Sequence, residues 1–142
     1  MQARYELGPF HMGRLPKGSD LLSGLLEVVK EKGITSGILW AIGGLESVRF
    51  AYYDQALKSY KEISIEKGLE ILSLVGNISQ KGDLPFIHAH IIVSDEEHTW
   101  GGHLMEGSKV FALEYHILEL RGPTLVRGFD PETGLFLWEK AK

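Results

Sequence analysis

The chain of 142 residues contains no cysteine, so it can form neither disulfide bonds nor thiolate metal sites. It has no apolar run close to the ~20 residues that a membrane-spanning helix needs. Its first five residues lack the apolar segment of a secretory signal. These absences predict a cytoplasmic protein with no membrane partner.

Clustered positive charge is also missing. No run of lysine and arginine exceeds two residues, and 19 acidic residues outnumber 15 basic ones, for a net charge of −4. Because nonspecific DNA affinity comes mostly from clustered basic groups, this composition argues against a surface built for DNA phosphates. A local basic patch is the remaining way in which the chain could contact DNA. With 44 % hydrophobic and 24 % charged residues the chain is typical of globular proteins, and we expect one domain, residues 1–142.

One helix is predicted over about residues 19–32. Ser19 has the character of an N-cap, and Asp20 would place negative charge in the first turn, where the helix dipole favours it. Gly33 is a natural stop signal. The apolar residues of this segment share one broad helical face: Leu21, Leu22, Leu25, Leu26, Val28 and Val29.

Most of the remaining chain has the apolar pattern of strands. Separate strands are predicted at 37–42 and 45–53, because a tight turn is the simplest interpretation of the Gly43-Gly44 pair between them. Residues 58–66 alternate charged and apolar side chains, which indicates an exposed or edge strand. The pattern as a whole predicts an α+β fold, with a mainly antiparallel sheet of about eight strands and one principal helix.

Four of the six histidines fall within sixteen positions, and three of them, His88, His90 and His103, are candidates for one site. His88 and His90 lie on a predicted strand over 86–93, and they share a face because side chains alternate along a strand. A polar turn follows, and a returning strand over 99–104 would place His103 opposite His90. All three imidazoles would then converge on one point.

That convergence predicts a three-histidine metal site with a fourth position open to water or a small ligand. A single strand histidine is usually structural, and a His-x-His pair occurs more often by chance than as a site. A third histidine in hairpin register, beside Gly101 and Gly102, favours the metal hypothesis, because glycines permit close backbone approach or a bulge that re-aims His103. Zinc suits all-histidine ligation best, and nickel, copper and iron are the alternative ions.

The other candidate residues have simpler interpretations. His98 lies in the polar turn, where we expect it to be solvated, and His11 and His116 are expected to be structural. Glu70 and Glu114 interrupt apolar strands, so each either faces solvent, the favoured interpretation, or lines a pocket. Neither the glutamate that follows His-x-His in cupins nor the Asp-His pair of metallo-β-lactamases is present.

The histidine pattern resembles the signature of the PPC ("plant and prokaryote conserved") domain family. The matching segments are Pro85-x-x-His88-x-His90, Gly101-Gly102-His103-Leu104-x-x-Gly107, Arg14 to Leu21, Gly43 to Asp54 and Glu70-Ile71-Leu72. The resemblance implies an α+β fold that assembles as a homotrimer, a metal, expected to be zinc, at His88, His90 and His103, and an association with DNA. This chain has no AT-hook. Lys67 occupies the position of the glycine in the Gly-Arg-Phe-Glu-Ile-Leu motif of the plant members.

Two hypotheses from different classes follow. The first is a metal-binding PPC protein with a binding or regulatory role, DNA-associated if the resemblance holds. The alternative is a zinc-dependent hydrolase or lyase, in which a metal-bound water with a pKa lowered towards ~7 would react. The enzyme hypothesis lacks an assigned general base.

Overall fold

The computed structural model describes the backbone of residues 1–141 and the side chains of residues 1–139. Nine strands and one helix follow one another along these residues: β1 Glu6–Leu15, α1 Leu21–Glu31, β2 Gly37–Asp54, β3 Ser59–Ile65, β4 Leu69–Lys81, β5 Leu84–Ser94, β6 Thr99–Leu104, β7 Lys109–Arg121, β8 Leu125–Asp130 and β9 Leu135–Ala141. The predicted α+β class, with a mainly antiparallel sheet and one principal helix, is confirmed.

The helix begins one residue later than predicted. Asp20, not Ser19, is the N-cap, because its carboxylate accepts the backbone N–H of Ser23 at 2.9 Å. The same carboxylate accepts the N–H groups of Gly107 and Ser108, so it also ties the helix to the chain before β7. Gly33, with φ +65°, follows the helix as expected. Within the described residues α1 is the one helix, and it is not long and apolar enough to cross a membrane.

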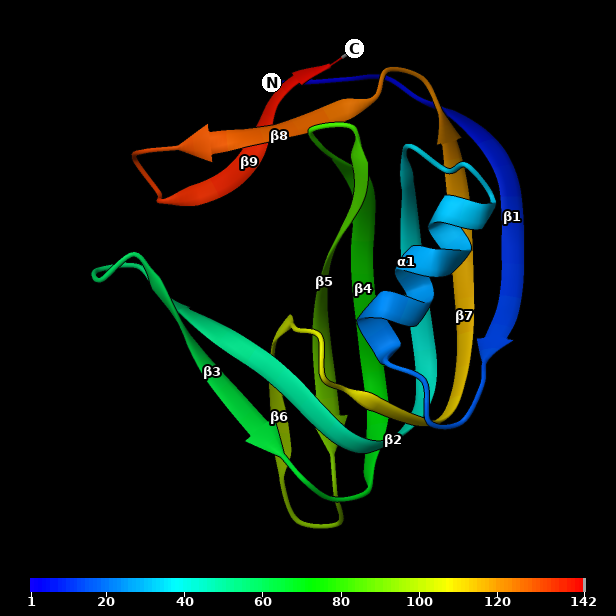
Figure 1. Ribbon diagram of the computed structural model, residues 1–142, viewed down its shortest axis with the longest axis vertical. Coiled ribbons are helices and arrows are strands. Elements are labelled where there is room, and N and C mark those ends of the chain that lie inside the picture. Colours follow the sequence, from blue (N-terminus) through cyan, green and yellow to red (C-terminus); the bar gives the residue numbers. More distant parts are fainter. Residues whose placement is uncertain (142) are drawn as a thin grey trace.

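The helix covers one face of the sheet (Figure 1). Leu21, Leu25 and Val29 of α1 are fully buried against it. Alternate residues of the central strands complete this core, including Leu39, Leu74, Ile91 and Ile117. At roughly 25 cal/mol per Å² of apolar surface, this burial is the main source of stability for the fold.

The predicted break at Gly43-Gly44 is wrong, because β2 runs through both glycines as one strand of 18 residues. Gly43 has φ +142°, and a Cβ there would lie 2.1 Å from the carbonyl oxygen of Ala112. A glycine bulge therefore bends the strand without ending it. The first half of β2 pairs with β4 and β7, while the second half pairs with β3 and β6.

Two hairpin arms project from the same side of the molecule (Figure 1). The lower arm, residues 48–65, is the second half of β2 with β3. Among the described strands β3 pairs with β2 alone, as predicted for an edge strand. The upper arm, residues 125–141, is β8 with β9, joined to the sheet by a short parallel pairing between β4 and β8. The tips meet where Tyr53 donates to the carbonyl oxygen of Thr133 at 2.5 Å and Lys58 donates to that of Pro131 at 3.0 Å.

Candidate metal centre

The three predicted histidines meet on the face of the sheet opposite α1. β5 and β6 pair so that His90 lies directly opposite His103, as the hairpin register predicted. The donor nitrogens of His88, His90 and His103 all lie within 4.8 Å of one another. The Nε2 atoms of His88 and His90 are 3.2 Å apart.

The two glycines before His103 allow β6 to fit between its neighbours. A Cβ at Gly102 would lie 2.6 Å from the carbonyl oxygen of Ala51 on β2, and one at Gly101 would lie 2.9 Å from that of Ile91 on β5. The β5–β6 register is regular, so the glycines permit close backbone approach rather than forming a bulge. This approach places the His103 imidazole beside the other two.

The histidine cluster suits a metal of the zinc type. Two nitrogens bound at ~2.0–2.1 Å in a tetrahedral site lie about 3.3 Å apart, close to the 3.2 Å between His88 and His90. Burial, then the charges of His103, Arg127 and His90, lowers the pKa of His88 to about 4. Burial, followed by the charges of His90 and Arg127, also lowers the pKa of His103. Metals bind neutral imidazole, so these two residues are in the ligating form at neutral pH.

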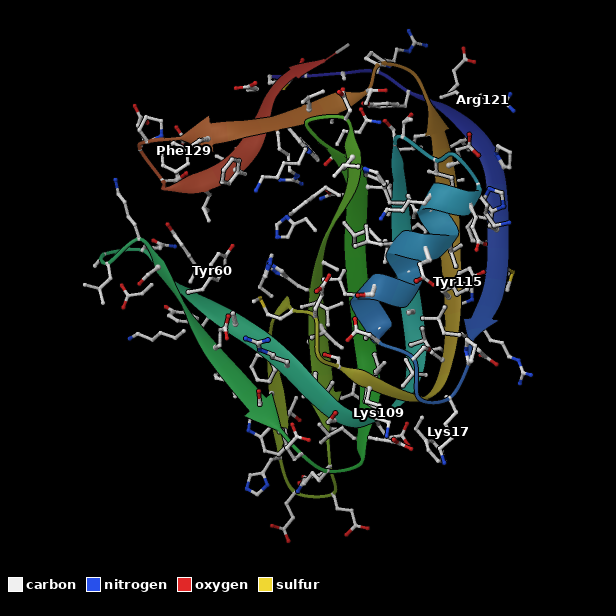
Figure 2. The ribbon with its side chains drawn as sticks, viewed as in Figure 1. Lys17, Tyr60, Lys109, Tyr115, Arg121 and Phe129 are labelled. Carbon is white, nitrogen blue, oxygen red and sulfur yellow. The ribbon has the colours of Figure 1, made fainter. Side chains whose placement is uncertain are left out.

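The cluster forms part of the floor of a cleft of about 640 Å³ between the two arms. Tyr60 of the lower arm lies 5.0 Å from the His103 ring, centroid to centroid, and 4.9 Å from the Tyr53 ring. Figure 2 shows Tyr60 on the lower arm and Phe129 on the upper one. Burial raises the pKa of Tyr60, so its phenol is protonated at neutral pH. The cleft is of the size that small-molecule sites usually have.

Arg127, a residue that the sequence did not single out, also lines this cleft. Its side chain is only 7 % exposed, and it donates to the Ser79 hydroxyl at 2.9 Å, the Asn77 side-chain oxygen at 2.9 Å and the Phe136 carbonyl at 3.0 Å. A signal existed in principle, since an arginine in an apolar strand pattern is unusual. Two of its partners, Asn77 and Ser79, are distant in sequence, so the pattern alone could not locate it.

The remaining candidate residues lie elsewhere. His11 contacts Glu119 at 3.4 Å, His116 lies near the Phe10 ring, and His98 is exposed in the turn and stacks on Trp100, as expected for structural or solvated residues. Glu70 and Glu114 are exposed and line a separate shallow hollow. Neither carboxylate belongs to the cleft that holds the histidines.

Comparisons with known proteins give consistent matches across the chain. Residues 2–121 match the family model of the Plants and Prokaryotes Conserved (PCC) domain. A metal-containing protein from Archaeoglobus fulgidus is 40 % identical, with a TM-score of 0.96 and 99 % of both chains covered. A plant- and prokaryote-conserved (PPC) protein from Pyrococcus horikoshii is 36 % identical, with a TM-score of 0.92 over 100 % of this chain and 99 % of that one.

A more distant structure is a proposed DNA-binding protein from Ralstonia eutropha, 26 % identical, with a TM-score of 0.80 over 96 % of this chain and 95 % of that one. A comparison with curated proteins gives no significant match. The family model covers most of the chain, and the two more similar structures agree with it along nearly their whole length. The chain therefore belongs to the plant and prokaryote conserved domain family.

Proposed function

We propose that this protein is a metal-binding PPC domain, extending over residues 1–142, in which His88, His90 and His103 hold one zinc ion. The observation that carries the proposal is the convergence of three donor nitrogens within 4.8 Å. Zinc is the ion best suited to neutral nitrogen ligands with an open position, and the similar Archaeoglobus protein is described as metal-containing. When bound, zinc would supply one open coordination position facing the cleft.

Metal analysis of purified protein tests the site. After zinc loading and dialysis, we expect about one zinc per chain in the wild type and a loss of most of it in His103→Ala, since a three-ligand site reduced to two binds weakly. The matched control is His98→Ala, which removes an exposed histidine from the next turn. Equal zinc content in the three proteins would overturn the proposal.

The geometry supports a binding or regulatory role better than hydrolysis. Of the described residues that line the cleft, none is an aspartate or glutamate. Asp95 is the acidic residue nearest to His90 along the chain. It lies in the turn between β5 and β6 and forms an ion pair with Lys67. The alternative of a zinc hydrolase or lyase therefore remains without a carboxylate as general base, and Tyr60 is held in its protonated form.

Self-association is the second part of the proposal. Cross-strand neighbours form one row across four strands of the sheet on the face opposite α1: Met12, His116, Trp40 and Val75. Phe10, Ile42 and Ile92 flank this row on the same face and are exposed. An extended exposed apolar face of this kind is typical of a protein interface. We propose that it forms the homotrimer that the resemblance to PPC domains implies.

Sedimentation or light scattering measures this assembly directly. The wild type is expected at three times the chain mass, and Ile42→Glu is expected at the monomer mass because it buries a charge at the centre of the apolar face. Leu57→Glu is the control, since Leu57 is also apolar and exposed but lies at the tip of the lower arm. A wild-type monomer would overturn this part of the proposal and leave the zinc site untouched.

A further inference from the structure

The cleft beside the histidine cluster contains a buried cation, Arg127. Arg127 is more than nine-tenths buried, yet within the described part of the chain no aspartate or glutamate forms an ion pair with it. Its hydrogen-bond partners Ser79, Asn77 and Phe136 are all neutral acceptors. Burying an unpaired charge is costly, so such a residue usually has a counter-ion in its functional state.

The orientation of the guanidinium leaves donors for that counter-ion. A guanidinium has five N–H bonds, and three of them donate to the partners just named. One N–H remains on each Nη nitrogen. Donors on two nitrogens of one guanidinium can pair with a carboxylate through two hydrogen bonds.

The surroundings of Arg127 are aromatic and positive. Its guanidinium carbon lies 5.1 Å from the centre of the Phe86 ring and 5.5 Å from that of Trp138. Lys81, which also lines the cleft, has its ammonium 3.5 Å from the Phe136 ring. Phe86 and Phe136 line the cleft, so it combines flat apolar walls with positive charge, in a chain whose net charge is −4.

The histidines lie close to this cation. Arg127 lines the same cleft as His88, His90 and His103, and its charge contributes to the lowered pKa values of His88 and His103. A metal at the histidines would add positive charge at the floor of the cleft. Carboxylate oxygens are common zinc ligands as well as common arginine partners, so one anionic group suits both.

We propose that the cleft binds a small organic carboxylate, with its anionic group between Arg127 and the open metal position and its apolar body against the aromatic walls. A guanidinium also pairs with phosphate, so inorganic phosphate, which has no apolar body to lie against the aromatic walls, is the competing anion in the test. This proposal deepens the proposed function, since it rests on the zinc site for the second contact of the carboxylate. The contact with Arg127 is independent of the metal.

Calorimetric titration with benzoate tests the proposal, with benzamide as its neutral isostere and inorganic phosphate as the competing anion. For zinc-loaded wild type we expect benzoate to bind, and benzamide and phosphate to bind at least about 10-fold more weakly. Arg127→Gln should weaken benzoate binding at least about 10-fold while retaining its zinc. Arg121→Gln is the matched control, because Arg121 is exposed at the end of β7, away from both arms (Figure 2).

Arg127→Gln loses buried hydrogen bonds and can fail to fold, so a measurement on the wild type accompanies it. In proton–nitrogen correlation spectra, benzoate and not benzamide should shift the Nε–H signal of Arg127. Equal benzoate affinity in wild type and a folded Arg127→Gln, no shift of that signal, or tighter binding of phosphate would each overturn the proposal.

The same titration on metal-free protein separates the two proposals. If zinc does not bind to the histidines, benzoate binding that still depends on Arg127 shows that the anion site exists without the metal. If zinc binds but the affinity for benzoate does not depend on Arg127, the zinc proposal stands and the carboxylate proposal fails.

Discussion

Asn77 lies directly opposite His88 on the paired strands β4 and β5, and its side-chain oxygen accepts a hydrogen bond of 2.9 Å from Arg127. The two residues share a face of the sheet, because directly paired residues do. Asn77 therefore holds the buried cation of the upper arm beside a candidate metal ligand. It connects the C-terminal hairpin to the site.

Replacing Asn77 should destabilise the protein without emptying the metal site. Asn77→Ala removes an acceptor from a buried guanidinium, and a hydrogen bond to a charged group contributes about 1.5–3 kcal/mol. We expect the free energy of unfolding, measured by urea denaturation, to fall by about 1–2 kcal/mol. Zinc content should stay at the wild-type value. Gln55→Ala is the control, since Gln55 is an exposed amide at the tip of the lower arm. If Gln55→Ala lowered the free energy of unfolding as much as Asn77→Ala, the result would contradict this account.

Adding a methyl group at Gly102 should disrupt the hairpin that carries His103. The new Cβ of Gly102→Ala would lie 2.6 Å from the backbone oxygen of Ala51, and backbone cannot move aside as a side chain can. Overpacking of this kind costs about 1–3 kcal/mol, and we expect weaker zinc retention as β6 shifts. Thermal denaturation and metal analysis measure both effects.

Gly68→Ala provides the matched control for that substitution. Nothing lies within 4 Å of a Cβ at Gly68, so the same chemical change meets open space. Its denaturation temperature and zinc content should match those of the wild type. Identical behaviour of the two alanine variants would show that the β6 contact is unimportant.

The stability of the metal-free protein should depend on pH through His88. Its pKa is lowered to about 4 in the folded state from 6.5, so between these values the unfolded chain binds more protons. The free energy of unfolding should therefore rise as pH increases from 4 to 6.5 and gain nothing further from this group above that. Denaturant titrations across the window should show a smaller rise for His88→Ala than for the wild type.

His98→Ala serves as the comparison for the pH series, because His98 is exposed. It should retain the full wild-type dependence on pH. A slope reduced as strongly in His98→Ala as in His88→Ala would mean that burial of His88 is not the cause.

Direct DNA binding, suggested for some structural relatives, should be weak and strongly salt-dependent. Several cations of this chain are already paired: Lys17 and Lys109 contact Glu46, Lys61 contacts Asp54 and Arg49 contacts Glu62. Fluorescence anisotropy with duplex DNA should give little binding at about 150 mM salt, because few phosphates would be neutralised. Tight binding with a shallow salt slope would contradict this expectation and point to base contacts.

The sequence by itself predicted the helix over about 19–32, the mainly antiparallel sheet and the register that sets His90 against His103. These features are local: the helical face repeats within one segment, and a hairpin with a short turn fixes its own pairing. The three-histidine cluster could be predicted because two members share one strand and the third lies on the next. The pattern did not distinguish a turn from a bulge at Gly43, because the difference depends on the Ala112 carbonyl of a distant strand.

The tertiary structure alone decided what surrounds the histidines. Arg127 reaches the cleft because β8 pairs in parallel with the end of β4, and Tyr60 reaches it because β2 bends and carries β3 past β6. Both placements depend on contacts between segments far apart along the chain, and no periodicity encodes such contacts. The sequence thus determined where three histidines converge, whereas the folded chain determined that a buried arginine lines the same cleft.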